Sequence, residues 1–394
     1  MPTPMDTGKR VGIAFLGCGY AADFYGPTLP NYPEIELLGA YDPASDRAKS
    51  FAAEYGGRVF GSMEEVLADP DVEIVVNLTP TTEHYSVNKA ALSAGKHVYC
   101  EKPMTTSMAQ ARELAALAAT RGLHLCSAPA TVFSRSAQTL IRAVHGGVAG
   151  TPRLAYASLD MGPLAFMAYR DWRSSRGVPW PYREEVGNGC VLEHAGYLLT
   201  WLTAMFGPVV GMSAQTVTPF ADQWEGVVDD VAPETSFGAL RFADGTVCRL
   251  TIGWAAPADK SLLVVGDQGV LSVDDVWQAS SPVMLRRRVH TSGRDTGYLA
   301  EPEQLPFVLP PLAHGYDDEA HDLTVAAGIA DLARAVRSGG RPLLGAEYSL
   351  HILDVSLRLA AARSTEEYLD VPAPSATSLW GDRYRQPARI SVPA

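Results

Sequence analysis

A Glu-Lys-Pro turn is the first stretch of this sequence that could do chemistry on a ligand. Glu101 and Lys102 follow residues 98–100, whose β-branched and aromatic character predicts a short strand, and residues 107–110 have the Ser-x-x-Gln pattern of a capping box. A strand therefore leads into a helix, and open α/β folds place ligands at such strand ends. The proline after Lys102 favours an extended backbone at the lysine, which can direct the ammonium at a ligand. The alternative is a solvated lysine in a surface turn.

A second candidate pair lies in residues 187–207, where a glycine-rich entry precedes an apolar periodic segment. This pattern predicts a loop followed by a helix. Glu193 and Tyr197 are four residues apart, so they share one helix face and can both reach into a cleft. The same spacing is compatible with two half-buried residues on an amphipathic helix.

The first strand of the chain ends in a glycine-rich turn that is typical of dinucleotide binding. Residues 11–16 form a near-continuous apolar run, the pattern of a strand buried on both faces of a parallel sheet. The turn that follows has the form GxGxxA, in which the first glycine makes the turn, the second admits a pyrophosphate and the small third residue lets helix and strand pack closely. We therefore predict cofactor contacts from Gly17, Gly19, Tyr20, Ala21 and Ala22.

An acid follows at the place where the dinucleotide fingerprint expects one. Residues 35–41 predict a second strand, which ends in Asp42, about 20 residues beyond the glycines. A carboxylate there accepts hydrogen bonds from the adenosine ribose and repels a 2′-phosphate, so NAD is slightly favoured over NADP. Arg47 could accommodate a 2′-phosphate if Asp42 turned aside. A structural glycine turn with a capping aspartate is the alternative.

A third buried strand adds further residues to the expected cleft. Residues 74–78 predict this strand, and Thr79 and Pro80 stand at its end. We expect Thr79, Pro80 and His84 to line the cofactor cleft, because strand ends of a parallel sheet meet at one edge. For His84 a capping or packing role is the alternative.

Composition narrows the classes of partner. The net charge of -12 argues against nucleic acid or an anionic membrane surface, which select for basic patches, and favours a small-molecule ligand. The five cysteines form no CxxC pair and no metal-type spacing, which predicts neither a disulfide framework nor a metal site. With neither a signal-peptide pattern nor an apolar run of membrane-spanning length, we expect a cytoplasmic protein.

The order of the predicted elements indicates an α/β protein of two domains. Strands and helices alternate through residue 126, which predicts a doubly wound sheet in a dinucleotide-binding domain of residues 1–130. Residues 131–394 show alternating polarity and a hairpin-like turn, which predict an α+β domain with an antiparallel sheet. The predicted elements there are helices at 139–145, 320–338 and 348–364, strands at 153–159, 246–252, 262–265 and 270–273, and an irregular segment at 286–311.

Several motifs together carry a resemblance to a known family. They are GCGYAA after the first strand, VYCEKPM, DWR at 171–173, the glycine-led helix at 187–200 and the GDQG hairpin. Over nearly its whole length the chain resembles the glucose-fructose oxidoreductase / inositol dehydrogenase / rhizopine-catabolism (Gfo/Idh/MocA) family. The resemblance implies a Rossmann domain, a C-terminal domain whose large open sheet commonly forms the interface of a homodimer or homotetramer, and nicotinamide-dependent oxidation or reduction of a sugar or cyclitol hydroxyl.

The resemblance also implies roles for single residues. Lys102 matches the family's active-site lysine, with Glu101 beside it, whereas the helix departs from the usual GGGxLxDxGxH. Asn188 replaces a glycine, Glu193 the aspartate and Tyr197 the histidine that is normally the acid/base. We expect Lys102 to lower the pKa of Tyr197 by about 1–3 units and so to make it the acid/base. Some sugar ketoreductases of the family pair lysine with tyrosine in this way. Lys102 would also stabilise the developing negative charge, and Glu193 would orient the substrate ring.

The expected activity is therefore that of an NAD(P)-dependent dehydrogenase or ketoreductase acting on a sugar, glycoside or cyclitol. Weaker candidates for substrate contact, each with a structural role as the alternative, are Arg173, Tyr182, Asn188 and His194. Two other functions stay open. One is an NAD-dependent glycosidase that works through a transient keto-sugar, and the other is a non-catalytic sensor, against which the retention of Lys102 speaks.

Overall fold

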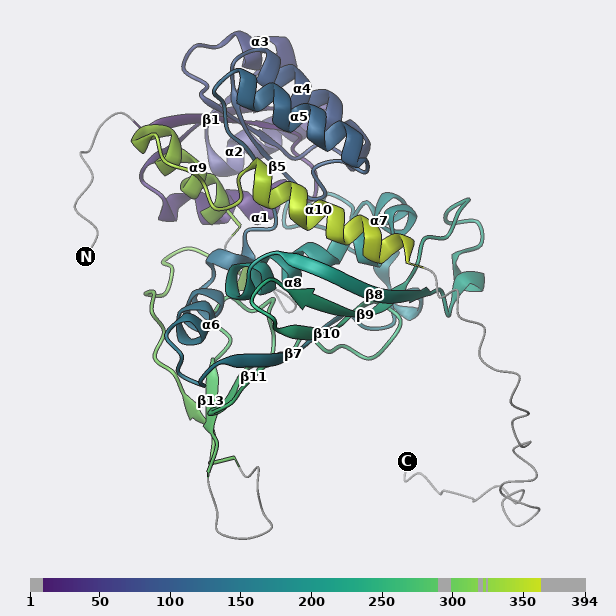
Figure 1. Ribbon diagram of the computed structural model, residues 1–394. Coiled ribbons are helices and arrows are strands. Elements are labelled where there is room, and N and C mark those ends of the chain that lie inside the picture. The colour runs from purple at the N-terminus through teal and green to yellow at the C-terminus, as the bar shows by residue number, and fades with distance from the viewer. Residues whose placement is uncertain (1–9, 290–298, 318–321, 324, 363–394) are drawn as a thin grey trace. The chain divides into compact units, whose positions relative to one another are not determined.

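The computed structural model describes residues 10–289, 299–317, 322–323 and 325–362, and six of its strands form one parallel sheet (Figure 1). Their order is β3-β2-β1-β4-β5-β6. Strands β2 and β3 are therefore added on one side of β1, and β4 to β6 on the other side. This confirms the predicted doubly wound sheet. The strands are β1 (Val11–Leu16), β2 (Ile35–Tyr41), β3 (Arg58–Val59), β4 (Ile74–Asn77), β5 (His97–Cys100) and β6 (Leu125–Ser127).

Both faces of this sheet are covered, because alternate residues of β1 enter different hydrophobic cores. Ile13 and Phe15 pack with Phe51 in one core, whereas Ala14 and Leu16 belong to the other. The apolar run of this strand is the consequence of burial on both sides. The helices of this part are α1 (Ala22–Tyr25), α2 (Ser45–Tyr55), α3 (Met63–Ala68), α4 (His84–Ser93) and α5 (Met108–Thr120).

The second sheet has eight strands in the order β14-β13-β12-β11-β7-β10-β9-β8. It is mostly antiparallel, as predicted, but β7 and β10 pair in parallel. Both strands therefore leave the sheet at the same end, where Asp160 and Gly253 are register partners. The strands are β7 (Pro152–Asp160), β8 (Val209–Val217), β9 (Thr235–Phe242), β10 (Val247–Gly253), β11 (Leu262–Gly266), β12 (Gly269–Val273), β13 (Met284–Arg287) and β14 (Glu303–Gln304), and a separate pair is formed by β15 (Tyr316–Asp317) and β16 (Asp322–Leu323).

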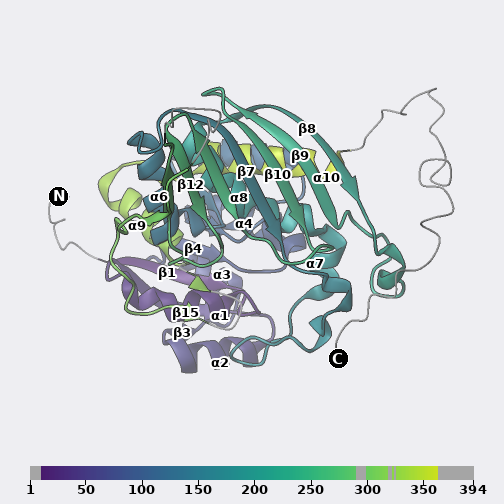
Figure 2. The same cartoon turned by 90° about the horizontal axis from the view of Figure 1, so that it is seen from below.

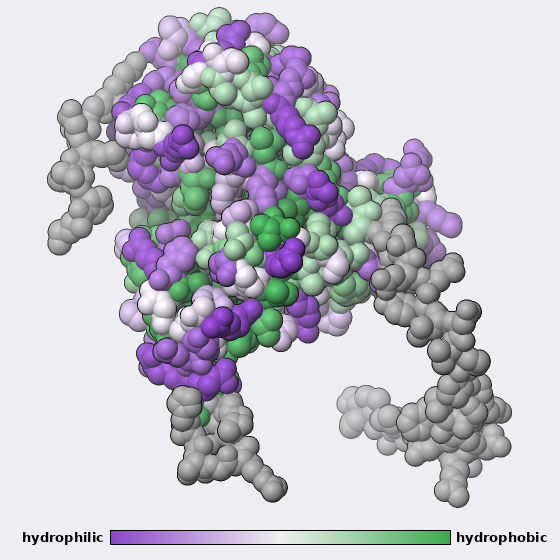
Figure 3. Space-filling view, in the orientation of Figure 1, coloured by the Kyte–Doolittle hydropathy of each residue, from purple (hydrophilic) through white to green (hydrophobic). Residues whose placement is uncertain are grey.

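One face of the second sheet is covered by helices α8 and α10, which lie behind the strands in Figure 2. Along β7 the side chains alternate, with Ala155 and Ala157 buried and Leu154 and Tyr156 exposed. On the face of the molecule shown in Figure 3, hydrophobic and hydrophilic residues are interspersed. The helices of this part are α6 (Arg135–His145), α7 (Tyr182–Asn188), α8 (Cys190–Phe206), α9 (Ala327–Ser338) and α10 (Ala346–Ala361).

The last two helices return to the first sheet. Helix α9 contacts β5, and α10 contacts α5 and β6 on one side and α8 and β8 on the other (Figure 1). The site helix α8 is thereby tied to the parallel sheet through α10. Residues 130 and 131, where we predicted the domain boundary, follow directly on β6, and that boundary stays a prediction.

Some local predictions are corrected by the structure. Ser107 stands at the N-cap of α5 but makes no side-chain cap bond. Its backbone N–H, which Gln110 would accept in a capping box, is donated to the Thr105 hydroxyl at 3.1 Å. The helix predicted from residue 320 begins at Ala327, after β16. The glycine-rich entry that we predicted as a loop from residue 187 contains the end of α7, at residues 187–188. The irregular segment predicted for 286–311 contains the end of β13 and all of β14, although residues 290–298 lie outside the described part. Within the described residues, no helix combines the length and apolarity that a membrane crossing needs.

Candidate functional site

A cavity of about 640 Å³ opens where the strand ends of the parallel sheet meet α8 and the loops of the second sheet. Its walls come from both parts of the chain. Of the predicted residues, those that line it are Gly17, Gly19, Tyr20, Ala21, Asp42, Arg47, Thr79, Pro80, His84, Glu101, Lys102, Glu193, His194 and Tyr197. Ala22, Arg173, Tyr182 and Asn188 are not among the lining residues.

The glycine turn after β1 has room for a dinucleotide. Gly17 adopts a φ of +94°, and a Cβ there would lie 2.5 Å from the Leu78 carbonyl oxygen, so another residue would be both strained and in collision. At Gly19 an added Cβ would meet nothing within 4 Å, which leaves open space above the backbone. Ala22 is fully buried in the core under the turn. A pyrophosphate can therefore approach the backbone closely, as the fingerprint requires.

Asp42 is fixed beside this turn by two backbone donors. Its Oδ2 accepts from the Cys18 N–H at 2.9 Å and its Oδ1 from the Ala44 N–H at 2.8 Å. Each carboxylate oxygen keeps a second lone pair for a ribose hydroxyl. Arg47 lines the same cavity. The glycine turn, the Asp42 carboxylate and Arg47 therefore fit a nicotinamide dinucleotide in this part of the cavity.

His84 connects the loops that follow β4 and β5. Its Nδ1 lies 2.7 Å from the Pro103 carbonyl oxygen and its Nε2 2.9 Å from the Thr79 carbonyl oxygen. Two carbonyl acceptors require a proton on both ring nitrogens, so the contacts fit an imidazolium. Burial lowers the pKa of His84, but Cys100 and the bond to Pro103 outweigh that effect and raise it to about 9.

The chemical centre of the cavity is a buried ion pair between its two parts. The Lys102 Nζ, from the turn after β5, lies 2.5 Å from the Glu193 Oε2 on α8 and 3.8 Å from the Glu185 Oε1 on α7. Asn188 Nδ2 donates to the other Glu193 oxygen at 2.8 Å. Glu193 is 2% exposed, so its negative charge depends on these partners.

Burial and charge set the protonation states of this group. Burial lowers the pKa of Lys102, but Glu185 and Glu193 more than compensate, so that its pKa lies well above the ordinary value. Burial raises the pKa of Tyr197 and outweighs the opposite effect of Lys102, so the predicted lowering of that phenol's pKa is wrong. Burial, and then the Glu193 carboxylate, raise the pKa of Glu185 to about 8 in spite of Lys102. Lys102 is therefore an ammonium and Tyr197 a neutral phenol.

Glu101 is held within the protein at the edge of the cavity. Its Oε1 accepts from the Tyr25 hydroxyl at 2.5 Å and its Oε2 from the Lys102 backbone N–H at 2.9 Å. Its negative charge is among the causes that raise the pKa of Lys102. The peptide bond between Lys102 and Pro103 is cis.

Two of the predicted substrate contacts are engaged elsewhere. Arg173 Nη1 donates to the carbonyls of Arg170 at 2.9 Å and Trp172 at 2.8 Å. The Tyr182 ring packs on Tyr169, with 5.4 Å between centroids. Asn188 acts on the cavity indirectly, through its bond to Glu193.

His194, by contrast, belongs to an aromatic wall of the cavity. Its ring centroid lies 5.7 Å from that of Trp277 and 6.0 Å from that of Trp254. Tyr197 packs on the same Trp277 at 5.3 Å. Trp172 also lines the cavity and is 38% exposed.

Sequence reasoning missed two charged residues. Glu185 lies in α7, and its neighbours Lys102 and Glu193 come from other elements, so no local pattern marks it. Arg176, in the loop before α7, forms a buried ion pair with Asp23 of α1. Its Nη2 also donates to the Cys18 carbonyl at 3.0 Å, which joins this loop to the glycine turn.

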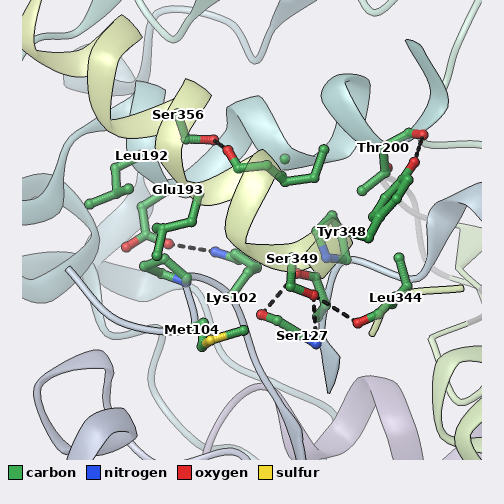
Figure 4. A pocket seen from close by; sticks show the side chains of 16 residues that line it. Lys102, Met104, Ser127, Leu192, Glu193, Thr200, Leu344, Tyr348, Ser349 and Ser356 are labelled. Carbon is green, nitrogen blue, oxygen red and sulfur yellow. Dashed lines mark hydrogen bonds and ion pairs between the residues drawn. The ribbon is translucent and has the colours of Figure 1, made fainter. Parts of the chain in front are cut away.

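A second, small cavity of about 30 Å³ lies on the other side of the Lys102–Glu193 pair (Figure 4). It separates this pair from α10. Ser349 on α10 donates to the Leu344 carbonyl at 2.7 Å, and Tyr348 donates to the Thr200 carbonyl of α8 at 2.5 Å. The Tyr348 bond supports the site helix from behind, and the Ser349 bond fixes the start of α10. Among the described residues, no group of three or more His, Cys, Asp or Glu side chains is placed to hold a metal ion.

Comparisons with known proteins agree with this geometry. Residues 11–128 match the model described as "Oxidoreductase family, NAD-binding Rossmann fold", and residues 137–272 match "GFO/IDH/MocA C-terminal domain". An uncharacterised oxidoreductase of Synechocystis is 25% identical over 68% of this chain and 72% of its own length. The trans-1,2-dihydrobenzene-1,2-diol dehydrogenase of Bos taurus is 28% identical over 60% of this chain and 66% of its own length.

Solved structures share the fold over most of the chain. A 3-ketoreductase from Actinomadura kijaniata in complex with TDP-benzene and NADP is 26% identical, with 90% of this chain and 98% of that chain covered and a TM-score of 0.66. The UDP-N-acetylglucosamine 3-dehydrogenase of Acidithiobacillus ferrooxidans is 19% identical, with 89% and 97% covered and a TM-score of 0.68, which shows the fold alone. With both domain models matched and a dinucleotide turn facing a buried lysine, the chain belongs to the Gfo/Idh/MocA family of NAD(P)-dependent oxidoreductases.

Proposed function

We propose that this protein interconverts a secondary hydroxyl and a ketone on a sugar, glycoside or cyclitol ring. The observation that carries the proposal is the buried Lys102 ammonium, held at 2.5 Å by Glu193 in the cavity that Tyr197 and the glycine turn also line. The nicotinamide, when bound, accepts or supplies the hydride.

Lys102 would hold the substrate oxygen and stabilise the negative charge that develops on it. Its charge is fixed, because neighbouring carboxylates keep its pKa well above the ordinary value. A fixed positive charge in a buried site is the kind of electrostatic stabilisation that usually contributes most to catalysis. Glu193 holds the ammonium in place, and a lone pair left on its carboxylate can still accept from a substrate hydroxyl.

Tyr197 would carry the proton. As a neutral phenol it can donate to a ketone oxygen in the direction of reduction. In the direction of oxidation it can take the hydroxyl proton only while its own proton moves on to another group. The phenol is thus a relay rather than a base.

The relatives support this reading. The names of the ketoreductase and of the diol dehydrogenase both describe hydroxyl–carbonyl chemistry. Solved structures of that ketoreductase also include one variant with a lysine replaced by alanine and one with a tyrosine replaced by phenylalanine. Its complex contains NADP, whereas Asp42 of this chain favours NAD, so the preferred dinucleotide is part of the test.

The test is a turnover assay with NAD and NADP on a panel of sugars, cyclitols, glycosides and their keto forms, followed by the absorbance of reduced nicotinamide. Lys102→Ala and Tyr197→Phe should each lower kcat by at least ~100-fold, a typical contribution of a general acid or base. Tyr182→Phe is the matched control, because that tyrosine does not line the cavity, and it should retain activity.

Other results would point elsewhere. Full activity of Tyr197→Phe would exclude the proton role of that residue. Release of an aglycone without net reduced cofactor would indicate the glycosidase, and binding of both ligands without turnover in either direction would indicate the sensor.

A further inference from the structure

Two carboxyl groups share one lysine at the bottom of the cavity. Glu185 on α7 and Glu193 on α8 both face Lys102, whose Nζ is 2.5 Å from the Glu193 Oε2 and 3.8 Å from the Glu185 Oε1. A single ammonium compensates one negative charge, and two carboxylates that share a buried site do not both ionise readily. Glu193 has the shorter ion pair and the Asn188 hydrogen bond, so it is the ionised member. Glu185 is therefore the member that gains and loses a proton.

Titratable groups from two other elements act on Glu185 or are acted on by it. Glu101 and Lys102 face it from the turn after β5, and Glu193, Cys190 and Tyr197 face it from α8. Burial and the Glu193 charge raise the pKa of Glu185 to about 8, so both of its forms are accessible near neutral pH. Lys102 and Tyr197 have pKa values above their ordinary range, so both are protonated at rest near neutral pH and neither stores the exchanged proton.

We propose that Glu185 is the proton reservoir of this site, exchanging one proton with the substrate oxygen through Lys102 and Tyr197. The inference rests on the proposed function. In oxidation a Lys102 proton first passes to ionised Glu185, and the phenol proton of Tyr197 passes to the amine so formed. The substrate O–H bond breaks as its proton replaces the one that Tyr197 gave up. The hydride leaves the carbon for the cofactor. Lys102 and Tyr197 end as they began, and Glu185 has gained the proton.

The first experiment needs no turnover. The infrared carbonyl band of protonated carboxyl groups is recorded against pH for the full chain without substrate. In the wild type one component should disappear with a midpoint near pH 8, the pKa of Glu185. This component should be lost in Glu185→Gln and kept in Glu184→Gln, whose carboxylate accepts from the Thr81 N–H instead. An unchanged band in Glu185→Gln overturns the proposal.

The second experiment uses the pH dependence of kcat in both directions. Oxidation requires ionised Glu185 and should fall as the pH drops below its pKa, whereas reduction requires the protonated form and should fall as the pH rises above it. Glu185→Gln should abolish the fall of kcat on both sides of the pH profile, which we call its two limbs. It should also lower kcat by roughly 10- to 100-fold, toward the low end of acid–base contributions, with a much smaller change in KM. Glu185→Asp should restore a limb at a shifted pH, which a merely structural role does not predict.

The two experiments separate the possible failures. If no panel substrate turns over, the infrared titration still decides whether Glu185 holds the exchangeable proton. If Glu185→Gln turns over with both limbs intact, the reservoir is excluded while the proposed function stands. If Glu185→Gln does not fold, Glu185→Asp takes its place in the infrared titration, and an unshifted band there overturns the proposal.

Discussion

Replacing Arg176 by alanine should destabilise the protein more than replacing Arg173, an exposed arginine of the same loop. The Arg176 side chain is 6% exposed and that of Asp23 is 0% exposed. Besides this ion pair, the guanidinium donates to the carbonyls of Cys18 at 3.0 Å and Arg47 at 3.2 Å. Removal of one partner of a buried pair costs about 3–5 kcal/mol, because the other charge stays buried without compensation.

The residual contacts of Asp23 place the expected loss at the lower end of this range. The Tyr55 hydroxyl still donates to Oδ1 at 3.2 Å, and the backbone N–H of residue 176 still donates to Oδ2 at 3.3 Å. We therefore expect Arg176→Ala to lower the free energy of unfolding by about 3 kcal/mol. Adding Asp23→Asn removes the uncompensated charge and should recover part of that loss.

The assay is equilibrium unfolding in urea, with Arg173→Ala as the matched control. Arg173 is an exposed arginine of the same segment that also donates to two backbone carbonyls, so its loss should cost less than about 1 kcal/mol. If Arg176→Ala is as stable as Arg173→Ala, or if Asp23→Asn worsens the loss, the buried ion pair does not contribute as argued.

Two further predictions concern the cofactor side of the cavity. His84 has a raised pKa, so its contribution to stability is complete below about pH 6.5 and is lost as the pH rises through about 9. The stability difference between wild type and His84→Gln should therefore shrink by roughly 3 kcal/mol over that window, and a constant difference in urea titrations would contradict the imidazolium. Asp42→Ala should lower the ratio of the Kd for NADP to the Kd for NAD by about tenfold, or 1.4 kcal/mol, in fluorescence titrations. An unchanged ratio would show that Asp42 does not contact the ribose.

Much of the parallel sheet could be predicted from the sequence, because its signals are local. Strands β1 and β2 have the predicted bounds, since an apolar run and a glycine or aspartate at its end mark each of them. The pairing of β7 with β10 could not be predicted, because about 90 residues separate the two strands and a parallel pair has no turn signature. Helix α7 was missed because YREEVGN is short and polar.

The site was predictable in its outline and not in its charges. Lys102, Glu193 and Tyr197 each stand in a recognisable pattern, and the structure brings them into one cavity. The pKa values of Lys102 and Tyr197 depend on burial and on neighbouring charges, among them Glu185, which lies 83 residues beyond Lys102 in the chain. The expected lowering of the Tyr197 pKa considered the charge of Lys102 but not the loss of water around the phenol.

The support that α10 gives to α8 has a consequence for synthesis of the chain. A nascent chain that has emerged through Phe206 already contains Lys102, Glu193 and Tyr197. It still lacks Tyr348, which bonds α8, and Ser349, whose hydroxyl accepts from the Ser127 N–H of β6 at 3.2 Å. The ribosome must therefore add about 150 more residues before the two halves of the ion pair are braced against each other. The reactive residues are therefore synthesised well before the helix that holds them in place.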